Sequence, residues 1–280
     1  MNKGIPFTEI IKGLPSKAPF IGPESLERRL GENFNLRLGA NESNFGMSSK
    51  AFKAIQEVIS ESSWYGDPEN YDLRCSLAEI YSISPEEICV AGGIDDLLGL
   101  VVRMTVKPGT PVVTSRGAYP TFNYHVFGFG GVLNKVPYFQ DRENLGSLLS
   151  ASIKKKAPLI YFSNPDNPMG TFHNAVDIQN FIDSIPNGKL LILDEAYYEF
   201  APLESIVAMD TSNERVVRMR TFSKAYGMAG LRIGYAIANK KIIDGLNKIR
   251  LHFAVNRIAQ IGALASLQDE GHIESVVNEV

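Results

Sequence analysis

One lysine of this 280-residue chain, Lys224, lies in a setting suited to covalent chemistry. It sits in the segment TFSKAYGMAGLRIG, residues 221–234, between two apolar runs. A lysine amine can form an imine with an aldehyde cofactor and can later act as a general base at a substrate carbon. Most lysines are plain surface residues, so the prediction depends on whether the rest of the chain supplies a matching site.

A carboxylate that could hold such a cofactor follows the apolar run at residues 190–193. Asp194 ends this run, and a carboxylate at the end of a buried strand needs a cationic or hydrogen-bonding partner. A protonated pyridine nitrogen would be such a partner, and the pair would make the ring an electron sink. The alternative interpretation is an aspartate that caps the N-terminus of a helix.

Two further segments could contact a planar ring. Residues 164–170 contain two X-Pro bonds, each of which restricts the residue before it. Such a loop can hold Asn167 rigidly, so that its amide could donate to a phenolic oxygen; a plain turn is the alternative. Tyr119 could stack on the ring, although aromatic residues in this position are more often part of the core.

An anion site is predicted at Gly92-Gly93-Ile94-Asp95-Asp96, which follows a strand and opens a helix. The exposed backbone N–H groups and the helix dipole attract an anion there, and the glycines allow close approach of the backbone. Ser223 and Arg232 could supply a hydroxyl and a guanidinium to the same phosphate. A structural ion pair is the alternative for Arg232, and the segment is neither a GxGxxG fingerprint nor a P-loop.

These segments must be positioned by an alternation of strands and helices. Strands are predicted at residues 88–91, 111–114, 132–136, 159–162, 190–193, 216–219 and 233–238, and helices at 48–62, 72–81, 95–106 and 119–127. Residues 1–35 are expected to be irregular, and 240–280 helical with a break near Gly271. The pattern predicts an α/β fold, a three-layer α/β/α domain with a mostly parallel sheet. Ligands bind at the carboxyl ends of such strands, where the polar segments lie.

The composition narrows the class of protein. Hydrophobic residues make up 44% and charged residues 21% of the chain, as in ordinary soluble enzymes. A net charge of −3 argues against nucleic-acid binding, and no apolar run approaches the ~18 residues that a membrane span needs. Cys75 and Cys89 lack CxxC spacing, so reduced thiols and a cytoplasmic location are expected. The four histidines form no metal-ligand pattern, so no metal is expected.

With these residues in place, the chain resembles the fold-type I pyridoxal-phosphate aminotransferases of class I/II, in particular the histidinol-phosphate aminotransferase-like proteins. The similarity runs from about Leu36 to the last helix. Its anchors are Leu38-Gly39-Ala40-Asn41-Glu42, Tyr65 with Asp67-Pro68, Gly93-Ile94-Asp95, Asn167-Pro168 with Gly170, Asp194-Glu195-Ala196-Tyr197, and Ser223-Lys224 with Arg232.

The resemblance implies a role for each of these residues towards pyridoxal 5'-phosphate. Lys224 would carry the cofactor as a Schiff base, Asp194 would hold the pyridine nitrogen, and Tyr197 and Asn167 would contact the ring oxygen. Lys224, Asp194 and Tyr197 are the expected catalytic residues. Tyr119 would stack on the ring. The expected phosphate contacts are Gly93, Ile94, Asp95, Ser223 and Arg232. Tyr65 would reach the phosphate of the neighbouring subunit's cofactor, which implies a homodimer.

The chain departs from the family pattern in three places. Ser43-Asn44 stands where Asn-Pro is usual, and Met169 replaces the usual threonine before the loop glycine. Related proteins also continue into a small C-terminal domain with an arginine for the substrate's carboxylate or phosphate, and no residue here matches it.

Three regions are expected along the chain. Residues 1–40 would form an N-terminal arm and residues 41–265 a large domain that binds the cofactor. Residues 266–280 would be the start of an incomplete small C-terminal domain, because the sequence ends at Val280.

The leading hypothesis is an aminotransferase with a ping-pong mechanism. Its small-molecule amino donor would be histidinol phosphate or an aromatic or other amino acid, and its acceptor a 2-oxo acid such as 2-oxoglutarate. A decarboxylase or lyase on the same fold, similar to threonine-phosphate decarboxylase, is an alternative, because the bond that breaks depends on how the substrate is oriented. A truncated cofactor-binding protein without turnover is the second alternative.

Overall fold

The computed structural model describes residues 4–15, 21–37 and 39–280. Leu38, one of the anchors of the resemblance, lies outside the described residues. Residues 1–3 and 16–20 of the expected N-terminal arm lie outside them as well.

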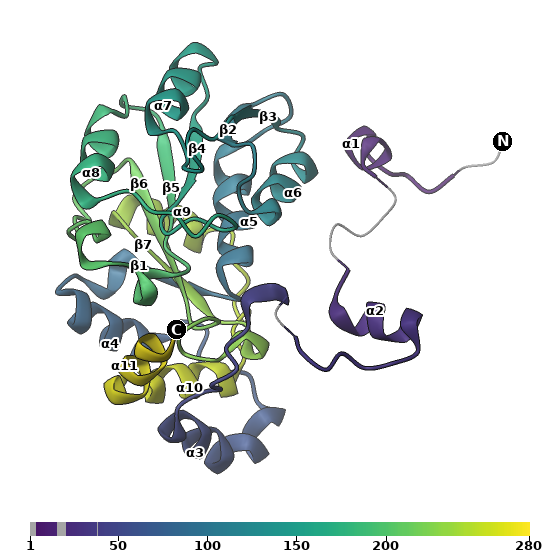
Figure 1. Cartoon of the computed structure of the whole chain (residues 1–280), viewed down its shortest axis with the longest axis vertical. Helices are drawn as coiled ribbons and strands as arrows, with labels where there is room; N and C mark the ends of the chain where they lie inside the picture. Colours follow the sequence, from purple (N-terminus) through teal and green to yellow (C-terminus); the bar gives the residue numbers. More distant parts are fainter. Residues whose placement is uncertain (1–3, 16–20, 38) are drawn as a thin grey trace.

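A seven-stranded sheet forms the centre of the molecule, in the order β1-β7-β6-β5-β4-β2-β3 (Figure 1). The strands are β1 (Ile88–Ala91), β2 (Pro111–Ser115), β3 (Val132–Val136), β4 (Leu159–Ser163), β5 (Leu190–Asp194), β6 (Val216–Thr221) and β7 (Gly234–Ala238). Strand β7 is antiparallel to both of its neighbours, and all other pairs are parallel. The prediction of a mostly parallel sheet is confirmed.

Helices cover both faces of this sheet, which confirms the three-layer architecture (Figure 1). One face packs against α5 (Ile94–Thr105), α6 (Pro120–Gly128) and α9 (Lys240–Asn247). The other face packs against α7 (Leu145–Lys154) and α8 (Ala175–Ser184) over one half, and α4 (Tyr71–Tyr81) and α10 (Arg257–Leu267) over the other. Two helices lie further out, α3 (Ser49–Val58) and α11 (Glu270–Glu279).

Burial on both faces explains the near-continuous apolar strand sequences. In β4, Leu159 and Tyr161 enter one core cluster, while Ile160 and Phe162 enter the opposite one. Successive side chains of a strand point to opposite faces, so a strand covered on both sides needs apolar residues at every position.

The expectations about the two ends of the chain are confirmed only in part. The region 1–35 contains α1 (Glu9–Gly13) and α2 (Pro23–Leu30), which lie beside the main body in Figure 1. Helix α2 has the usual terminal signals, a proline in its first turn and the left-handed Gly31 after its last residue. A break does lie near Gly271, at residues 268–269 between α10 and α11. A longer break that was not expected spans residues 248–256 and ends where the Asn256 side chain caps α10.

The strands β1, β2, β4, β5 and β6 run in one direction, so their carboxyl ends meet at one edge of the sheet. The loops that follow them carry residues 92–93, 116–119, 164–170, 195–197 and 222–224. All the polar segments identified in the sequence therefore reach this edge.

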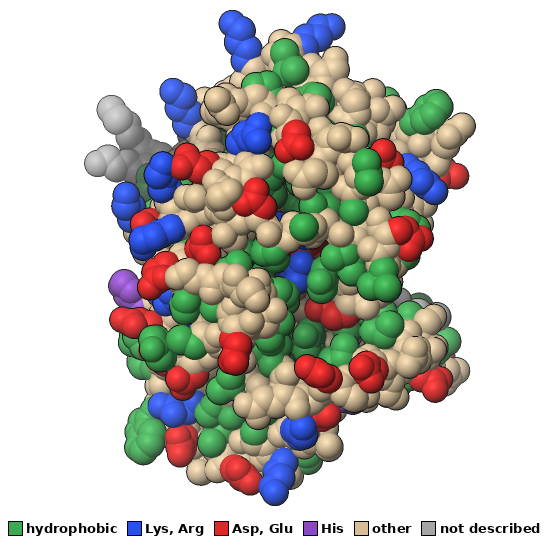
Figure 2. Space-filling model, turned by 90° about the vertical axis from the view of Figure 1, so that its left-hand side faces the viewer, with side chains coloured by type: hydrophobic (Ala, Val, Ile, Leu, Met, Phe, Trp, Pro, Cys, Tyr) green, Lys and Arg blue, Asp and Glu red, His purple; other side chains and the backbone are tan. Residues whose placement is uncertain are grey.

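The surface has a mixed character. Figure 2 shows a face on which apolar side chains gather across the middle, with acidic and basic side chains interspersed around them. None of the helices in the described parts of the chain combines the length and the hydropathy that crossing a membrane requires.

Candidate active site

A cavity of about 620 Å³ opens at the carboxyl edge of the sheet. The predicted site residues that line it are Ile94, Asp95, Tyr119, Asn167, Asp194, Tyr197, Ser223, Lys224 and Arg232. Gly93 lies directly beside it, because a Cβ atom added there would meet Arg232 Nη2 at 2.7 Å. The structure thus brings together segments from five separate loops, and leaves Tyr65 elsewhere.

Lys224 reaches the cavity from the loop after β6. Its Nζ donates to the main-chain oxygens of Ala40 at 2.8 Å and Asn41 at 3.2 Å. Burial lowers the pKa of the Lys224 amine, while the charges of Asp95 and Glu42 act in the opposite direction. A lowered pKa increases the fraction of neutral amine, which is the nucleophilic form.

Asp194 is 4% exposed and lines the same cavity from the end of β5. Its Oδ2 accepts from the Tyr161 hydroxyl at 2.7 Å, and its Oδ1 accepts from the main-chain N–H of Ala196 at 3.0 Å. Burial raises the pKa of Asp194 to about 6, against the opposing effect of these hydrogen bonds. Among the described residues no lysine or arginine forms an ion pair with it. The cavity therefore contains a buried carboxylate that lacks a cation.

Tyr161 is the residue that sequence reasoning missed. It is fully buried in β4, and its ring stacks on Phe122 with the centroids 4.6 Å apart. Tyr161 and Ser163 share one face of β4, and Ser163 pairs in register with Asp194, so Tyr161 lies near this carboxylate. Within the apolar run, alternation along the strand places Tyr161 on the same face as Ser163.

Tyr197, Tyr119 and Asn167 surround the same space. The Tyr197 hydroxyl accepts from Asn41 Nδ2 at 2.7 Å, and the ring centroid of Tyr197 lies 5.7 Å from Lys224 Nζ. Tyr119 is half-buried at the start of α6, and burial raises the pKa of its phenol to about 12. These groups stay neutral near pH 7 and can act as hydrogen-bonding or stacking surfaces.

The N-terminus of α5 forms the opposite end of the site. Gly93 caps the helix with φ of +93°, a conformation that a residue with a side chain rarely adopts. Arg232 lies over this glycine and contacts Asp95 Oδ2 at 3.5 Å, with both side chains about half exposed. The Ser223 hydroxyl accepts from Thr221 Oγ1 at 2.9 Å, which leaves its own hydrogen available. A helix N-terminus, a hydroxyl and a guanidinium together suit a phosphate.

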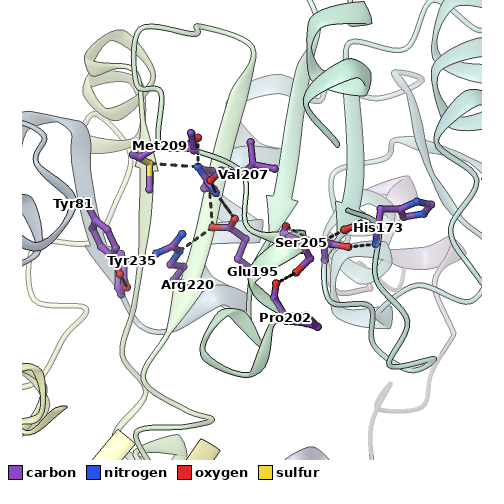
Figure 3. A network of polar contacts seen from close by, with 12 residues as sticks. Tyr81, His173, Glu195, Pro202, Ser205, Val207, Met209, Arg220 and Tyr235 are labelled. Carbon is purple, nitrogen blue, oxygen red and sulfur yellow. Dashed lines mark hydrogen bonds and ion pairs between the residues drawn. The ribbon is translucent and has the colours of Figure 1, made fainter. Parts of the chain in front are cut away.

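Glu195 follows Asp194 but belongs to a different arrangement, shown in Figure 3. It is 5% exposed and lies 2.7 Å from Arg218 Nη2 and 2.8 Å from Arg220 Nε. Arg220 also lies over the ring of Tyr198, at 3.3 Å from the centroid, and over that of Tyr81, at 4.7 Å. The network joins β5 to β6 beneath the loops that carry Asp194 and Lys224.

Tyr65 is not among the residues that line the cavity. Its side chain is 74% exposed and stacks on Phe253, with ring centroids 4.4 Å apart. Its placement therefore separates it from the cavity of its own chain.

The cavity matches the expected cofactor in three respects. Pyridoxal phosphate carries a basic ring nitrogen, an aldehyde and an anionic phosphate. The buried carboxylate of Asp194 suits the first, the amine of Lys224 the second, and the α5 terminus with Arg232 the third.

Comparison with known proteins agrees with this geometry. The sequence model of the aminotransferase class I and II family matches residues 35–280. Histidinol-phosphate aminotransferase 2 of Carboxydothermus hydrogenoformans is 32% identical over 273 residues, which is 95% of this chain and 75% of that protein. The histidinol-phosphate aminotransferase of Caldicellulosiruptor saccharolyticus is 33% identical over 275 residues, 96% of this chain and 75% of that protein.

A solved structure is similar over most of the chain. It is the histidinol-phosphate aminotransferase of Sinorhizobium meliloti in complex with pyridoxal 5'-phosphate, with a TM-score of 0.95 and 45% identity. The match covers 98% of this chain and 74% of that one, so this chain spans about three quarters of such relatives. The chain therefore belongs to the class I and II aminotransferases, which are pyridoxal-phosphate-dependent enzymes.

Proposed function

We propose that the cavity at the carboxyl edge binds pyridoxal phosphate and transfers an amino group from histidinol phosphate, or a related amine, to a 2-oxo acid such as 2-oxoglutarate. One observation carries the proposal: the amine of Lys224 and the cation-free carboxylate of Asp194 line one cavity. When bound, the cofactor supplies an aldehyde for an amine and a ring that accepts an electron pair.

Lys224 acts as the catalytic base in this proposal. Its amine is released from the carbonyls of Ala40 and Asn41 and takes a proton from the substrate carbon that bears the amino group. The lowered pKa of Lys224 supports this role, because a base that is fully protonated cannot accept a proton. The same amine would then carry this proton, which gives Lys224 the role of both base and acid.

Asp194 and the residues around it orient the ring. An ionised Asp194 would hold a proton on the ring nitrogen, and the hydrogen bond from Tyr161 keeps its carboxylate turned into the cavity. Tyr197 and Asn167 would donate to the ring oxygen, and Tyr119 would stack on the ring face. The phosphate would lie at Gly93, Ile94 and Asp95 of the α5 terminus, with Ser223 and Arg232.

The names of the relatives support histidinol phosphate as the donor. The threonine-phosphate decarboxylase of Porphyromonas gingivalis has 22% identity and a TM-score of 0.71, so it is similar in fold alone. Amino transfer is therefore favoured over decarboxylation.

A homodimer with Tyr65 contributed to the partner's site is part of the proposal. Tyr65 belongs to an exposed apolar group with Trp64, Leu251 and Phe253, which are 65%, 71% and 48% exposed. Exposed apolar side chains that gather in this way mark protein interfaces. Burial of this group against a second copy would bring Tyr65 near a neighbouring cavity.

The regional assignments follow from the same site. We assign the described parts of residues 1–40 to an arm, 41–265 to the cofactor-binding domain and 266–280 to the start of a small C-terminal domain. Helix α11 of this last region lies close to the site, because Val276 and Val280 line a second hollow of about 600 Å³ together with Lys224. A cytoplasmic location is proposed because Cys75 and Cys89 are unpaired.

The test combines spectroscopy with a product assay. Purified protein mixed with pyridoxal phosphate should develop a visible absorption band, and Lys224→Ala should lose both the band and the transfer of nitrogen from histidinol phosphate to 2-oxoglutarate. Lys155→Ala, which changes an exposed lysine of the same sequence, is the matched control. A band that persists in Lys224→Ala, or carbon dioxide among the products, contradicts the proposal.

A further inference from the structure

Two buried carboxylates lie close to Asn167, one within its loop and one next to it. Glu143, which precedes α7, is 2% exposed, and Asp166, in the loop after β4, is 4% exposed. Ser163 stands between them: its Oγ lies 2.9 Å from Glu143 Oε1 and 2.9 Å from Asp166 Oδ1. The main-chain N–H of Ser163 also donates to Glu143 Oε1 at 3.0 Å. The three side chains form a carboxyl–hydroxyl–carboxyl chain.

The hydrogen bonds among Glu143, Ser163 and Asp166 require one more proton than the serine hydroxyl supplies. A serine hydroxyl carries one hydrogen and can donate a full hydrogen bond to one acceptor only. The second 2.9 Å contact is satisfied only if one of the two carboxyl groups supplies a hydrogen. If both groups were ionised, two like charges would face each other through one oxygen, inside a protein environment that screens them poorly.

The surrounding groups do not neutralise this pair. The Tyr138 hydroxyl donates to Asp166 Oδ2 at 2.9 Å, and a ring nitrogen of His173 lies 2.7 Å from the main-chain oxygen of Glu143. Within the described residues, no lysine or arginine nitrogen forms an ion pair with either carboxylate.

Other charged and titratable groups near the pair are Arg142, whose charge acts on His173, and Tyr161, which both carboxylates affect. Burial raises the pKa of Glu143 to about 7, against the effect of the Ser115 hydroxyl and the Ser163 amide, and the charge of Asp166 raises it further.

Asp166 connects this pair to the cavity. Its main-chain N–H donates to the Thr171 oxygen at 2.9 Å, and its own main-chain oxygen accepts from Gly170 at 3.0 Å. These bonds close the turn in which the next residue, Asn167, lines the cavity. The side chain of Asp166 is thus the point at which the turn is fastened to β4.

We propose that Glu143 is a positioning residue, which shares one proton with Asp166 through Ser163 and thereby fastens the turn that presents Asn167 to the cofactor ring. The part of this inference that concerns the ring rests on the proposed function. When the shared proton leaves as the pH rises through about 7, the two carboxylates repel each other and the turn loosens. The affinity for the cofactor then falls, although neither carboxylate lines the main cavity beside Lys224.

Infrared spectroscopy of the protein without cofactor tests the shared proton. The C=O stretch of a protonated carboxyl group should titrate near pH 7. It should disappear in Glu143→Gln and titrate at clearly lower pH in Asp166→Asn, because removal of Asp166 frees the Ser163 hydrogen for Glu143 and takes away the like charge, while burial continues to act on Glu143. A band with an unchanged titration in Asp166→Asn would show a single buried acid and overturn the sharing. Asp194→Asn serves as the control, because it must remove a different band.

Cofactor titrations from pH 6 to 9 test the positioning. Between pH 6 and 9 the dissociation constant for pyridoxal phosphate should increase in the wild type about five-fold more than it increases in Glu143→Gln. This factor corresponds to the loss of one ordinary hydrogen bond. In an Asn167→Ala background the two profiles should coincide. Equal profiles in the presence of Asn167 overturn the positioning role. A protein that binds no cofactor contradicts the proposed function, while the infrared titration still decides whether the proton is shared.

Discussion

Asp194 and Glu195 are consecutive carboxylates at the end of one strand, and their charge partners and the directions of their pKa shifts are opposite. Their exposed fractions are 4% and 5%, so burial does not distinguish them. Glu195 faces two arginines, which hold its pKa below the usual value in spite of burial. Asp194 has hydrogen bonds but no cation, and burial raises its pKa to about 6. The charge of Glu195 is balanced by arginines of the same chain, whereas no lysine or arginine of the described residues forms an ion pair with Asp194.

Strand geometry explains how adjacent residues reach such different regions. Successive side chains alternate between faces, so Asp194 and Glu195 leave β5 in different directions. Arg218 and Arg220 are two residues apart on β6 and therefore share a face, which lets both contact Glu195. Figure 3 shows the contact between Arg220 and Glu195. The end of β5 thus supplies both a carboxylate that lines the cavity and a carboxylate that links β5 to β6.

The largest effect is expected from Asp194→Asn, which keeps the shape but removes the negative charge. In the proposed function Asp194 would hold the proton of the cofactor ring, so its loss should reduce kcat/KM by about 10²- to 10⁴-fold. The free energy of unfolding of the cofactor-free protein should rise, although the activity falls. The folded pKa of about 6 lies above the unfolded value, so Asp194 destabilises the protein without cofactor as pH rises through this range.

At pH 8 the substitution should therefore stabilise the protein without cofactor by about 2–3 kcal/mol, and at pH 4 it should have little effect. Steady-state kinetics and urea unfolding at the two pH values measure both consequences. If the free energy of unfolding of Asp194→Asn minus that of wild type is lower at pH 8 than at pH 4, the ionised carboxylate does not destabilise the cofactor-free protein. That result would contradict the proposal that Asp194 pairs with a cationic ligand.

Glu195→Gln should produce the reverse pattern. Removing the charge between two buried arginines should lower the free energy of unfolding by about 3–5 kcal/mol. The pKa of Glu195 is lowered in the folded state, so its contribution is present above the unfolded pKa and disappears as pH falls through the folded value. Glu204→Gln, at an exposed position, is the matched control. If Glu195→Gln has the same free energy of unfolding as wild type, the ion pairs of Glu195 with Arg218 and Arg220 do not stabilise the fold.

Two arginines extend the comparison. Arg232 is half-exposed and loosely paired with Asp95, whereas the Arg220 side chain is 1% exposed. Arg232→Lys should weaken cofactor binding by about ten-fold, because an ammonium cannot form a forked contact with phosphate. Its free energy of unfolding should stay within about 0.5 kcal/mol of wild type. Arg220→Lys should instead destabilise the fold. Cofactor titration in phosphate-free buffer and urea unfolding of both variants test the contrast.

The sequence was sufficient to predict most of this arrangement. Short apolar runs separated by helices indicate a mostly parallel sheet, and the rule that ligands bind at the carboxyl ends of strands places Lys224, Asp194 and Asn167 at one edge. Tyr161 was not predicted, since its contact with Asp194 depends on which strands are neighbours. The arginine partners of Glu195 could not be predicted for the same reason, because strand order is not encoded by local periodicity.

Other differences have different physical causes. Tyr65 is 74% exposed, and the proposed homodimer would bury it; the sequence of one chain gives no direct information about such a contact. Helix α2 was missed because its proline and glycines were interpreted as loop residues, although they mark its two ends.

Tyr161→Phe should have the smallest effect, and it bears most directly on the difference between the two carboxylates. The hydroxyl of Tyr161 is the side-chain donor to Asp194, and its loss should raise the pKa of that carboxylate above about 6. Protonated Asp194 cannot pair with a ring cation, so cofactor affinity should begin to fall at a higher pH on acidification. At pH 8 the loss should be only about two- to three-fold, because Asp194 is still ionised there. Tyr235→Phe removes an equally buried hydroxyl that contacts Tyr81 instead, and it should leave the pH profile unchanged. If both variants shift the profile alike, general destabilisation accounts for the effect, and Asp194 does not depend on Tyr161 for its charge.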